Sequence, residues 1–449
     1  MYLQKKNNEN FEFFTKNYIP WGLIKRKPGF LKLLKKEIEK SDIIDNFNSA
    51  SDKIIKNFVK AVNLDSKIHK TIVFISGKCY PNISRQASYM KKNRFKTYLI
   101  TMENLSKKNL EMIENSFDEI LQNCSFFPTL GKIINSISPC FFHVQCWMWD
   151  FSLGKFVIKQ RSKSKVICDF YDVTGMYANY DDLKIVFDEH SIKQDLSCEK
   201  FIFENSDGII HRYKESVFIE YAKRYKNNGK FLEFQQYADT KLSQSNKLTV
   251  KNEKLKFVFC GTLIPPNDIN HPHELFSPAG LSYSFNKILE GNHELNVFQP
   301  LNSNKEFNKW LFDLKKNKFS ETLKIHNFLP LSELIEKISE YDFGINIQQV
   351  DMKKTRVSKY TFDGAMGTKN YTYLEAGLPI IVNKEFKYHD EIVTKNNIGL
   401  SIQSEDLSNF NHLLKNINLN VLKENVKKFN LKNSLLIQGK DLLSFYNSL

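Results

Sequence analysis

Short apolar runs alternate with segments of helical spacing along much of the chain. The run at 71–76 leads into a glycine loop, a segment with helical spacing at 84–92 and a second apolar run at 97–101. Further apolar runs follow at 141–145, 165–170 and 208–211, with helical segments at 181–187 and 192–203. Buried strands that alternate with helices are typical of a parallel sheet covered on both faces. The first half therefore predicts a Rossmann-like α/β domain.

The same alternation begins again after a polar, nearly featureless stretch at 240–254, which predicts a linker. The second series of apolar runs lies at 256–261, 294–298, 323–327, 343–347, 380–382 and 399–402. We therefore expect a basic helical extension at 1–65, an α/β domain at 66–239, the linker at 240–254, a second α/β domain at 255–430 and a helix at 431–449. Two such halves place a ligand cleft between them.

Charge and composition narrow the classes of partner. The chain has 449 residues and a formal net charge of +15. Frequent lysine throughout the chain accounts for this charge, and attraction to anionic membrane surfaces or phosphate-bearing substrates is the functional alternative. No recognised nucleic-acid-binding motif occurs, so we expect no nucleic-acid partner.

Membrane and redox signals are weak. No run of about 18 apolar residues predicts a membrane span, and the start has no signal-like apolar region. A basic, aromatic segment at 19–38 fits either a peripheral membrane contact or a helix that caps the first domain. The seven cysteines include no C-x-x-C pair and indicate core residues in a reducing cytoplasm.

The most informative segment is 367–382, in which a Gly-Thr-Lys loop opens a short helix. This helix ends at Gly377 and Pro379, before an apolar strand. The free N–H groups at a helix start form an anion site, and Lys369 adds a positive charge beside them. The segment therefore predicts a phosphate or pyrophosphate site.

Several motifs of the second half resemble the donor domain of GT-B-fold glycosyltransferases, in the family-four-like group of bacterial surface-polysaccharide enzymes. The motifs lie at 257–261, 328–335, 341–346, 369–380 and 397–402, and the first half fits more loosely. The resemblance implies an α/β GT-B fold, with two Rossmann-like domains whose parallel sheets face a central cleft. It also implies a nucleotide-sugar donor and no metal or other cofactor.

By this resemblance, the donor site is expected to comprise Gly261, Lys369, Thr368, Thr372, Glu375 and Gly77. The chain departs from the family at three places. Thr372 stands where a glutamate is expected to hold the ribose, and the acidic partner of that glutamate is missing near Gly364. The cationic residues expected after Gly261 are also missing. A hydroxyl binds a ribose without charge and therefore more weakly. These departures leave the nucleotide base open.

An inverting transfer needs a general base on the acceptor side, whereas a retaining transfer may need none. Asp172 and His143 are the candidate catalytic residues, because both lie near the ends of predicted strands of the first half. A satisfied core histidine is the alternative for His143, and Asp169 fits a structural charge. Trp147 and Trp149 fit either an acceptor-sugar platform or the core.

The residues 271–274, His-Pro-His-Glu, have no evident further ligand and do not predict a metal site. The sequence thus predicts transfer of a sugar to a glycan, lipid-linked or protein acceptor, in the cytoplasm or at the inner face of the plasma membrane. A non-catalytic GT-B-like binding subunit and a sugar-nucleotide epimerase of the same fold are the alternatives.

Overall fold

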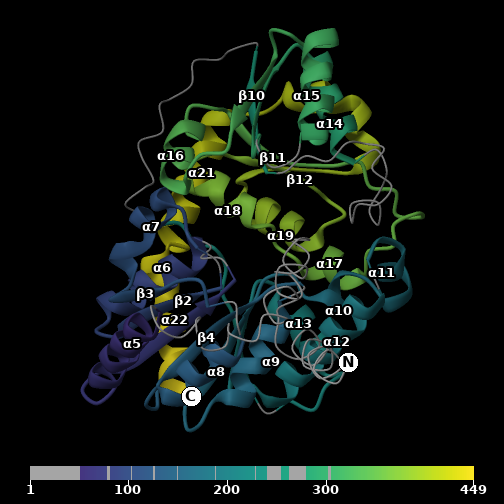
Figure 1. Ribbon diagram of the computed structural model, residues 1–449. Helices are drawn as coiled ribbons and strands as arrows, with labels where there is room; N and C mark the ends of the chain where they lie inside the picture. Colours follow the sequence, from purple (N-terminus) through teal and green to yellow (C-terminus); the bar gives the residue numbers. More distant parts are fainter. Residues whose placement is uncertain are drawn as a thin grey trace, which may run out of the picture.

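The computed structural model shows two α/β domains, one above the other in Figure 1. It describes residues 51–77, 81–102, 104–124, 127–148, 150–187, 189–227, 229–239, 254–261, 280–301 and 305–449. The expectations for the membrane contact at 19–38, most of the linker, Trp149 and the 271–274 segment lie outside the described residues.

The first domain is built on a sheet of parallel strands. In the described part of the chain this sheet has seven strands in the order β3-β2-β1-β4-β5-β6-β7. The strands are β1 (Thr71–Ser76), β2 (Lys96–Thr101), β3 (Glu119–Leu121), β4 (Phe141–Cys146), β5 (Lys165–Phe170), β6 (Gly208–His211) and β7 (Lys230–Glu233). The residues of β1 are buried on both faces, which explains why its run is continuously apolar.

Helices cover both faces of this sheet and form an apolar core on each side. They are α5 (Ser51–Asp65), α6 (Pro81–Lys92), α7 (Lys107–Ile113), η1 (Glu114–Ser116), α8 (Phe127–Ser136), α9 (Phe151–Gln160), α10 (Thr174–Tyr177), α11 (Tyr180–Val186), α12 (Glu189–Asn205) and α13 (Glu215–Ala222). The helices expected at 84–92, 181–187 and 192–203 correspond to α6, α11 and α12, which begin or end a few residues away.

The second domain repeats this plan. Its described strands form a parallel sheet of six in the order β10-β9-β8-β11-β12-β13. The strands are β8 (Lys256–Cys260), β9 (Glu294–Gln299), β10 (Leu323–Asn327), β11 (Phe343–Asn346), β12 (Ile380–Asn383) and β13 (Gly399–Ile402).

Helices follow or flank these strands and pack on the sheet, which forms two further apolar cores with them. They are α14 (Gly280–Glu290), α15 (Lys305–Lys318), α16 (Leu331–Ile338), α17 (Lys359–Gly364), α18 (Thr368–Glu375), α19 (Lys387–Asn396), η3 (Ser404–Asn409), α20 (Phe410–Leu414), α21 (Leu419–Lys432) and α22 (Leu435–Ser448). Two parallel, doubly wound sheets confirm the predicted fold class of two Rossmann-like α/β domains.

The last helix, α22, returns to the first domain, and Figure 1 shows the C-terminal end among the helices of that domain. Phe445 and Tyr446 are buried against the first sheet, and Lys70 Nζ donates to Asn447 Oδ1 at 2.6 Å. The sequence predicted a helix at 431–449, and the structure shows that it packs on the first domain. The returning helix therefore ties the two domains together.

Direct contacts also join the domains near the carboxyl ends of their strands. Ala178 and Val357 form an isolated antiparallel bridge, as do Tyr213 and Ala365. An apolar cluster combines residues of both domains: Ala178, Leu183, Phe187, Ile192, Val350, Val357, Phe362 and Phe386. The carboxyl edges of the two sheets consequently lie on the side where the domains meet.

The described cysteines are all free thiols. Five of them, Cys124, Cys146, Cys168, Cys198 and Cys260, are buried, as expected for small core residues. Within the residues that the structure describes, no helix has the length and apolar character needed to cross a bilayer.

Replacing Phe445 with alanine should destabilise the first domain by about 3–5 kcal/mol, because it leaves a cavity against the sheet. Leu436→Ala on the same helix is the matched control, since Leu436 is 65% exposed and should cost little. Urea unfolding of both variants measures the difference. Equal stabilities would show that α22 is not anchored by Phe445.

Candidate active site

The strand order of each sheet reverses beside its first strand, β1 in the first domain and β8 in the second. Open α/β sheets bind ligands outside the carboxyl ends of the strands at such a switch point. Gly77 directly follows β1, and Gly261 directly follows β8. Two of the predicted donor-site glycines therefore lie where the topology favours a ligand.

Gly261 and Lys369 come together at the switch point of the second sheet. A Cβ atom at residue 261 would lie 3.4 Å from Lys369 Nζ, and Gly261 has a φ of +150°, which L side chains rarely adopt. The same Nζ lies 4.4 Å from the centroid of the Phe259 ring. The end of β8 thus holds the ammonium against an aromatic face and a glycine.

The ammonium of Lys369 makes no hydrogen bond or ion pair with any described residue. Its side chain is partly exposed, yet the protein around it removes enough water to lower its pKa to about 8. The desolvated ammonium is therefore stabilised mainly by the aromatic ring. A bound anion would supply the negative charge that stabilises this ammonium.

The start of α18 adds backbone donors beside this ammonium. Gly367 is the N-cap and carries no capping side chain, while its own N–H donates to His389 Nε2 at 3.1 Å. Asn346, at the end of β11, donates to Asn370 Oδ1 at 3.0 Å and so fixes the first turn. The first N–H groups of a helix have no intrahelical acceptor and favour an anion. The helix start and the Lys369 ammonium therefore lie together, and their binding of an anion stays a prediction.

Two other predicted donor residues on α18 are buried and contact the segment 235–239, where the chain leaves the first domain. Gln236 Nε2 donates to Thr372 Oγ1 at 3.3 Å, and the N–H of Asp239 donates to Glu375 Oε1 at 2.9 Å. Thr372 is 7% exposed and Glu375 fully buried. These side chains attach α18 to the crossing segment, while their contact with a donor stays a prediction.

Arg85 of α6 completes this attachment. Its Nη2 lies 2.6 Å from Glu375 Oε2, and its Nη1 donates to the carbonyl oxygen of Tyr237 at 3.1 Å. Burial raises the pKa of the Glu375 carboxyl, and the Arg85 guanidinium opposes this rise. The ion pair therefore links α6 of the first domain to the helix that carries Lys369.

Asp172 lies two residues beyond β5, at the carboxyl edge of the first sheet. Its side chain is exposed, and Trp147 Nε1 donates to its Oδ2 at 2.6 Å. The surrounding protein nevertheless raises the pKa of Asp172, against the lowering effects of Trp147 and Arg212. An accessible carboxylate with a raised pKa suits a general base, and this role stays a prediction.

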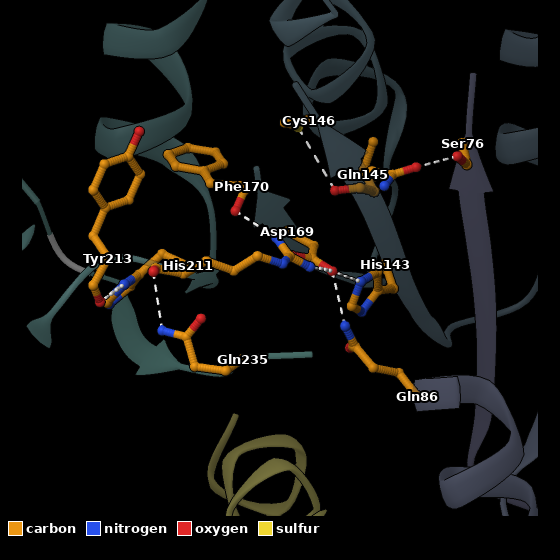
Figure 2. Close-up of polar contacts among 12 residues, drawn as sticks. Ser76, Gln86, His143, Gln145, Cys146, Asp169, Phe170, His211, Tyr213 and Gln235 are labelled. Atoms are coloured by element: carbon orange, nitrogen blue, oxygen red, sulfur yellow. Dashed lines mark hydrogen bonds and ion pairs between the residues drawn. The ribbon is translucent and has the colours of Figure 1, made fainter. Parts of the chain in front are cut away.

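His143 is fully buried within β4, and both of its ring nitrogens have partners. Figure 2 shows the contact with Asp169. Nδ1 lies 2.6 Å from Tyr446 Oη, and Nε2 lies 3.2 Å from Asp169 Oδ2. No ring nitrogen is left for a substrate, because both are already engaged. This geometry favours the core alternative for His143 over the catalytic one.

Asp169 is the centre of the same buried cluster (Figure 2). Burial alone would raise its pKa, but Arg212, whose Nη1 lies 2.9 Å from Oδ1, and His143 together hold the pKa well below its usual range. Gln86 Nε2 adds a bond to Oδ2 at 2.9 Å. The expectation that Asp169 is a structural charge agrees with these contacts.

Gly77 is buried at the end of β1, and residues 78–80 after it lie outside the described residues. None of the described contacts joins Gly77 to Lys369. Sequence reasoning missed Arg85, His389 and Asn346. No sequence pattern links these residues to α18, because each lies in a different strand or helix.

The described residues contain no group of His, Cys, Asp or Glu side chains that could hold a metal ion. The expectation of a metal-independent reaction stays a prediction.

Comparison with known proteins gives one family and several solved structures. Residues 285–442 match the family described as Glucosyltransferase 3-like, C-terminal domain. No curated protein matches the chain. The matched range includes α18 and Lys369, and the family-four-like grouping stays a prediction.

The similar solved structures have low sequence identity. The MnaA–UDP structure from S. aureus is 10% identical, with 80% of this chain and 91% of that chain covered and a TM-score of 0.48. UDP-GlcNAc 2-epimerase from Neisseria meningitidis, bound to UDP-GlcNAc, is 12% identical, with 84% and 100% covered and a TM-score of 0.44. The glycosyltransferase SnogD from Streptomyces nogalater is 10% identical, with 84% and 99% covered and a TM-score of 0.40. The strand order itself shows two Rossmann-like α/β domains, and the family match falls mainly in the second of them.

Arg85→Met should destabilise the protein by about 3 kcal/mol or more, because it leaves the Glu375 carboxylate buried without its partner. Lys108→Met is the matched control. Lys108 also pairs across the domains, 3.0 Å from Glu333, but both side chains are more than half exposed, so the loss should stay below about 1 kcal/mol. Chemical denaturation compares the variants. Equal losses would mean that the buried pair does not hold the domains together.

Proposed function

We propose that the protein transfers a sugar from a nucleotide-sugar donor to a glycan, lipid-linked or protein acceptor. The observation that carries the proposal is the Lys369 ammonium, which has no hydrogen-bond or ion-pair partner among the described residues and lies beside Gly261 at the start of α18. A diphosphate fits this site, because it supplies the negative charge and the acceptor oxygens that the ammonium and the helix N–H groups require. The match of residues 285–442 to a glucosyltransferase family supports the same activity.

In the proposed reaction, the second domain binds the donor and the first domain binds the acceptor. The acceptor hydroxyl oxygen attacks the anomeric carbon, and the bond from that carbon to the diphosphate oxygen breaks. The nucleoside diphosphate leaves with the bonding electrons, and Lys369 with the helix N–H groups stabilises its charge. In an inverting transfer, Asp172 accepts the proton of the hydroxyl. The step then balances with the donor, the acceptor and these protein groups.

The setting of the reaction is also proposed. Bacterial surface-glycan assembly in the cytoplasm, with a contact at the inner membrane face, follows from the family resemblance and from the basic composition of the chain. The free cysteines are compatible with a reducing compartment.

Thermal stabilisation by a panel of UDP-, GDP-, CMP- and ADP-sugars tests the donor site. We expect one nucleotide to raise the melting temperature of the wild type, since a ligand that binds the folded state stabilises it. The same nucleotide should stabilise Lys369→Ala much less. Lys395→Ala, which removes an exposed lysine near the end of α19, should behave as the wild type. Stabilisation by none of the nucleotides would favour the non-catalytic binding subunit.

Lys369→Ala should reduce turnover by about 10²-fold or more if the ammonium stabilises the leaving diphosphate. Release of nucleoside diphosphate from the donor found in the panel measures the rate. Lys369→Arg keeps the charge and should retain part of the activity. Wild-type turnover in the alanine variant would remove Lys369 from the mechanism.

Nucleotide affinity should depend on pH through Lys369. Its pKa is about 8 in the free protein, and the charged form binds the anion. The dissociation constant should therefore be constant below that pH and rise about tenfold per pH unit above it, until the pKa of the complex is reached. Isothermal titration between pH 6 and about pH 9.5 measures the profile. A flat profile in the wild type would contradict the assignment, and Lys369→Ala should give one.

A further inference from the structure

Trp147 and Asp172 form a pair at the acceptor side of the molecule. They extend from the neighbouring parallel strands β4 and β5, which end at Cys146 and Phe170. The indole Nε1 donates to Asp172 Oδ2 at 2.6 Å, and the N–H of Met148 donates to the carbonyl oxygen of Asp172 at 3.0 Å. A side-chain bond and a backbone bond therefore fix the two loops relative to one another.

The loop of Asp172 is also held from the far side. The N–H of Val173 donates to Tyr213 Oη at 3.1 Å, and the Arg212 guanidinium lies 3.4 Å from the centroid of the Tyr171 ring. Arg212 is itself fixed by its ion pair with the buried Asp169. These contacts hold Asp172 in one position before any substrate arrives, as a preorganised site requires.

The pair differs from its buried neighbours in being open to solvent. Asp169 and His143 are fully buried, whereas Asp172 is exposed and Trp147 is partly exposed. In the described contacts of the Asp172 side chain, Oδ2 accepts the hydrogen bond from the indole N–H. Oδ1 therefore remains for an incoming hydroxyl. A structural bond that merely closes a loop would not require either group at the surface.

An aromatic face beside a fixed carboxylate matches the chemistry of a sugar. The C–H face of a pyranose packs on an aromatic ring, and its hydroxyl groups donate to carboxylate oxygens. Small-molecule sites generally combine an apolar wall with a few well-placed polar groups. The ring and the carboxylate are linked by a hydrogen bond, so a sugar on one is in reach of the other.

We propose that Trp147 and Asp172 together form the acceptor subsite, in which the indole ring packs on an acceptor sugar. The indole N–H holds Asp172 so that Oδ1 faces the sugar hydroxyl. Trp147 is a positioning residue for Asp172 as well as a binding surface. This inference rests on the proposed transferase function.

The pair can be tested without any activity. Protein labelled with ¹⁵N at its four tryptophans gives indole N–H signals, and Trp147→Phe identifies the signal of Trp147. We expect this signal to shift with pH in the wild type, because Asp172 titrates beside it, and not to shift in Asp172→Asn. The groups that face Asp172 are Trp147, Arg212, Tyr177 and Tyr213. A signal that does not titrate, or titrates equally in Asp172→Asn, would overturn the pairing.

Kinetics then separate positioning from packing. Trp147→Phe keeps a ring but removes the N–H that lowers the pKa of Asp172. The acid limb of kcat/KM should therefore move to higher pH, with a loss of about tenfold or more below neutral pH. Trp147→Ala also removes the ring, and should raise the KM of a p-nitrophenyl glycoside acceptor further than Trp147→Phe. An unchanged acid limb in Trp147→Phe would overturn the positioning role.

The donor panel distinguishes failure of this inference from failure of the proposed function. Trp147→Phe and Trp147→Ala should retain the wild-type stabilisation by the nucleotide, since Lys369 lies in the other domain. If a nucleotide binds and the wild type transfers sugar, but neither tryptophan variant changes the acceptor KM or the pH profile, the acceptor subsite is wrong and the donor site stands. If no nucleotide binds the wild type, the transferase function itself fails.

Discussion

The buried ion pair between Arg85 and Glu375 is the contact on which the candidate site depends. Arg85 Nη2 of the first domain lies 2.6 Å from Glu375 Oε2 of α18, the helix that carries Lys369. The crossing segment 235–239 binds the same helix through Asp239 and Gln236. These contacts therefore fix the helix that carries Lys369 relative to the first domain.

The two halves of the site differ in how charge is treated. In the second domain, the Lys369 ammonium has no anionic partner among the described residues, and burial lowers its pKa to about 8. A bound anion would stabilise the charged form of this lysine. In the first domain, the buried Asp169 is neutralised by Arg212, while the exposed Asp172 keeps a raised pKa. Fully paired charges thus form the scaffold, and in our proposal the incompletely paired ones bind the donor and the acceptor.

Much of the fold was predictable, because buried parallel strands are continuous apolar runs that can be read directly. The strands at 71–76, 165–170, 208–211, 323–327 and 399–402 have the bounds that the sequence indicates. Of the candidate site, Thr368 and Lys369 were proposed from one local loop-helix pattern, and Gly261 from the family resemblance. Thr372 and Glu375 belong to the same pattern, but whether they face a donor or another part of the protein is decided by residues far away in the sequence.

The sequence by itself determined the alternation of strands and helices, the division into two α/β halves and the helix that carries Lys369, since all of these depend on neighbouring residues. The tertiary structure decided which charges are available. It placed Arg85 on Glu375, Tyr446 of the returning helix on His143, and Trp147 on Asp172. These partners are 25 to 303 positions apart, and such pairings follow from the packing of whole elements rather than from any local pattern.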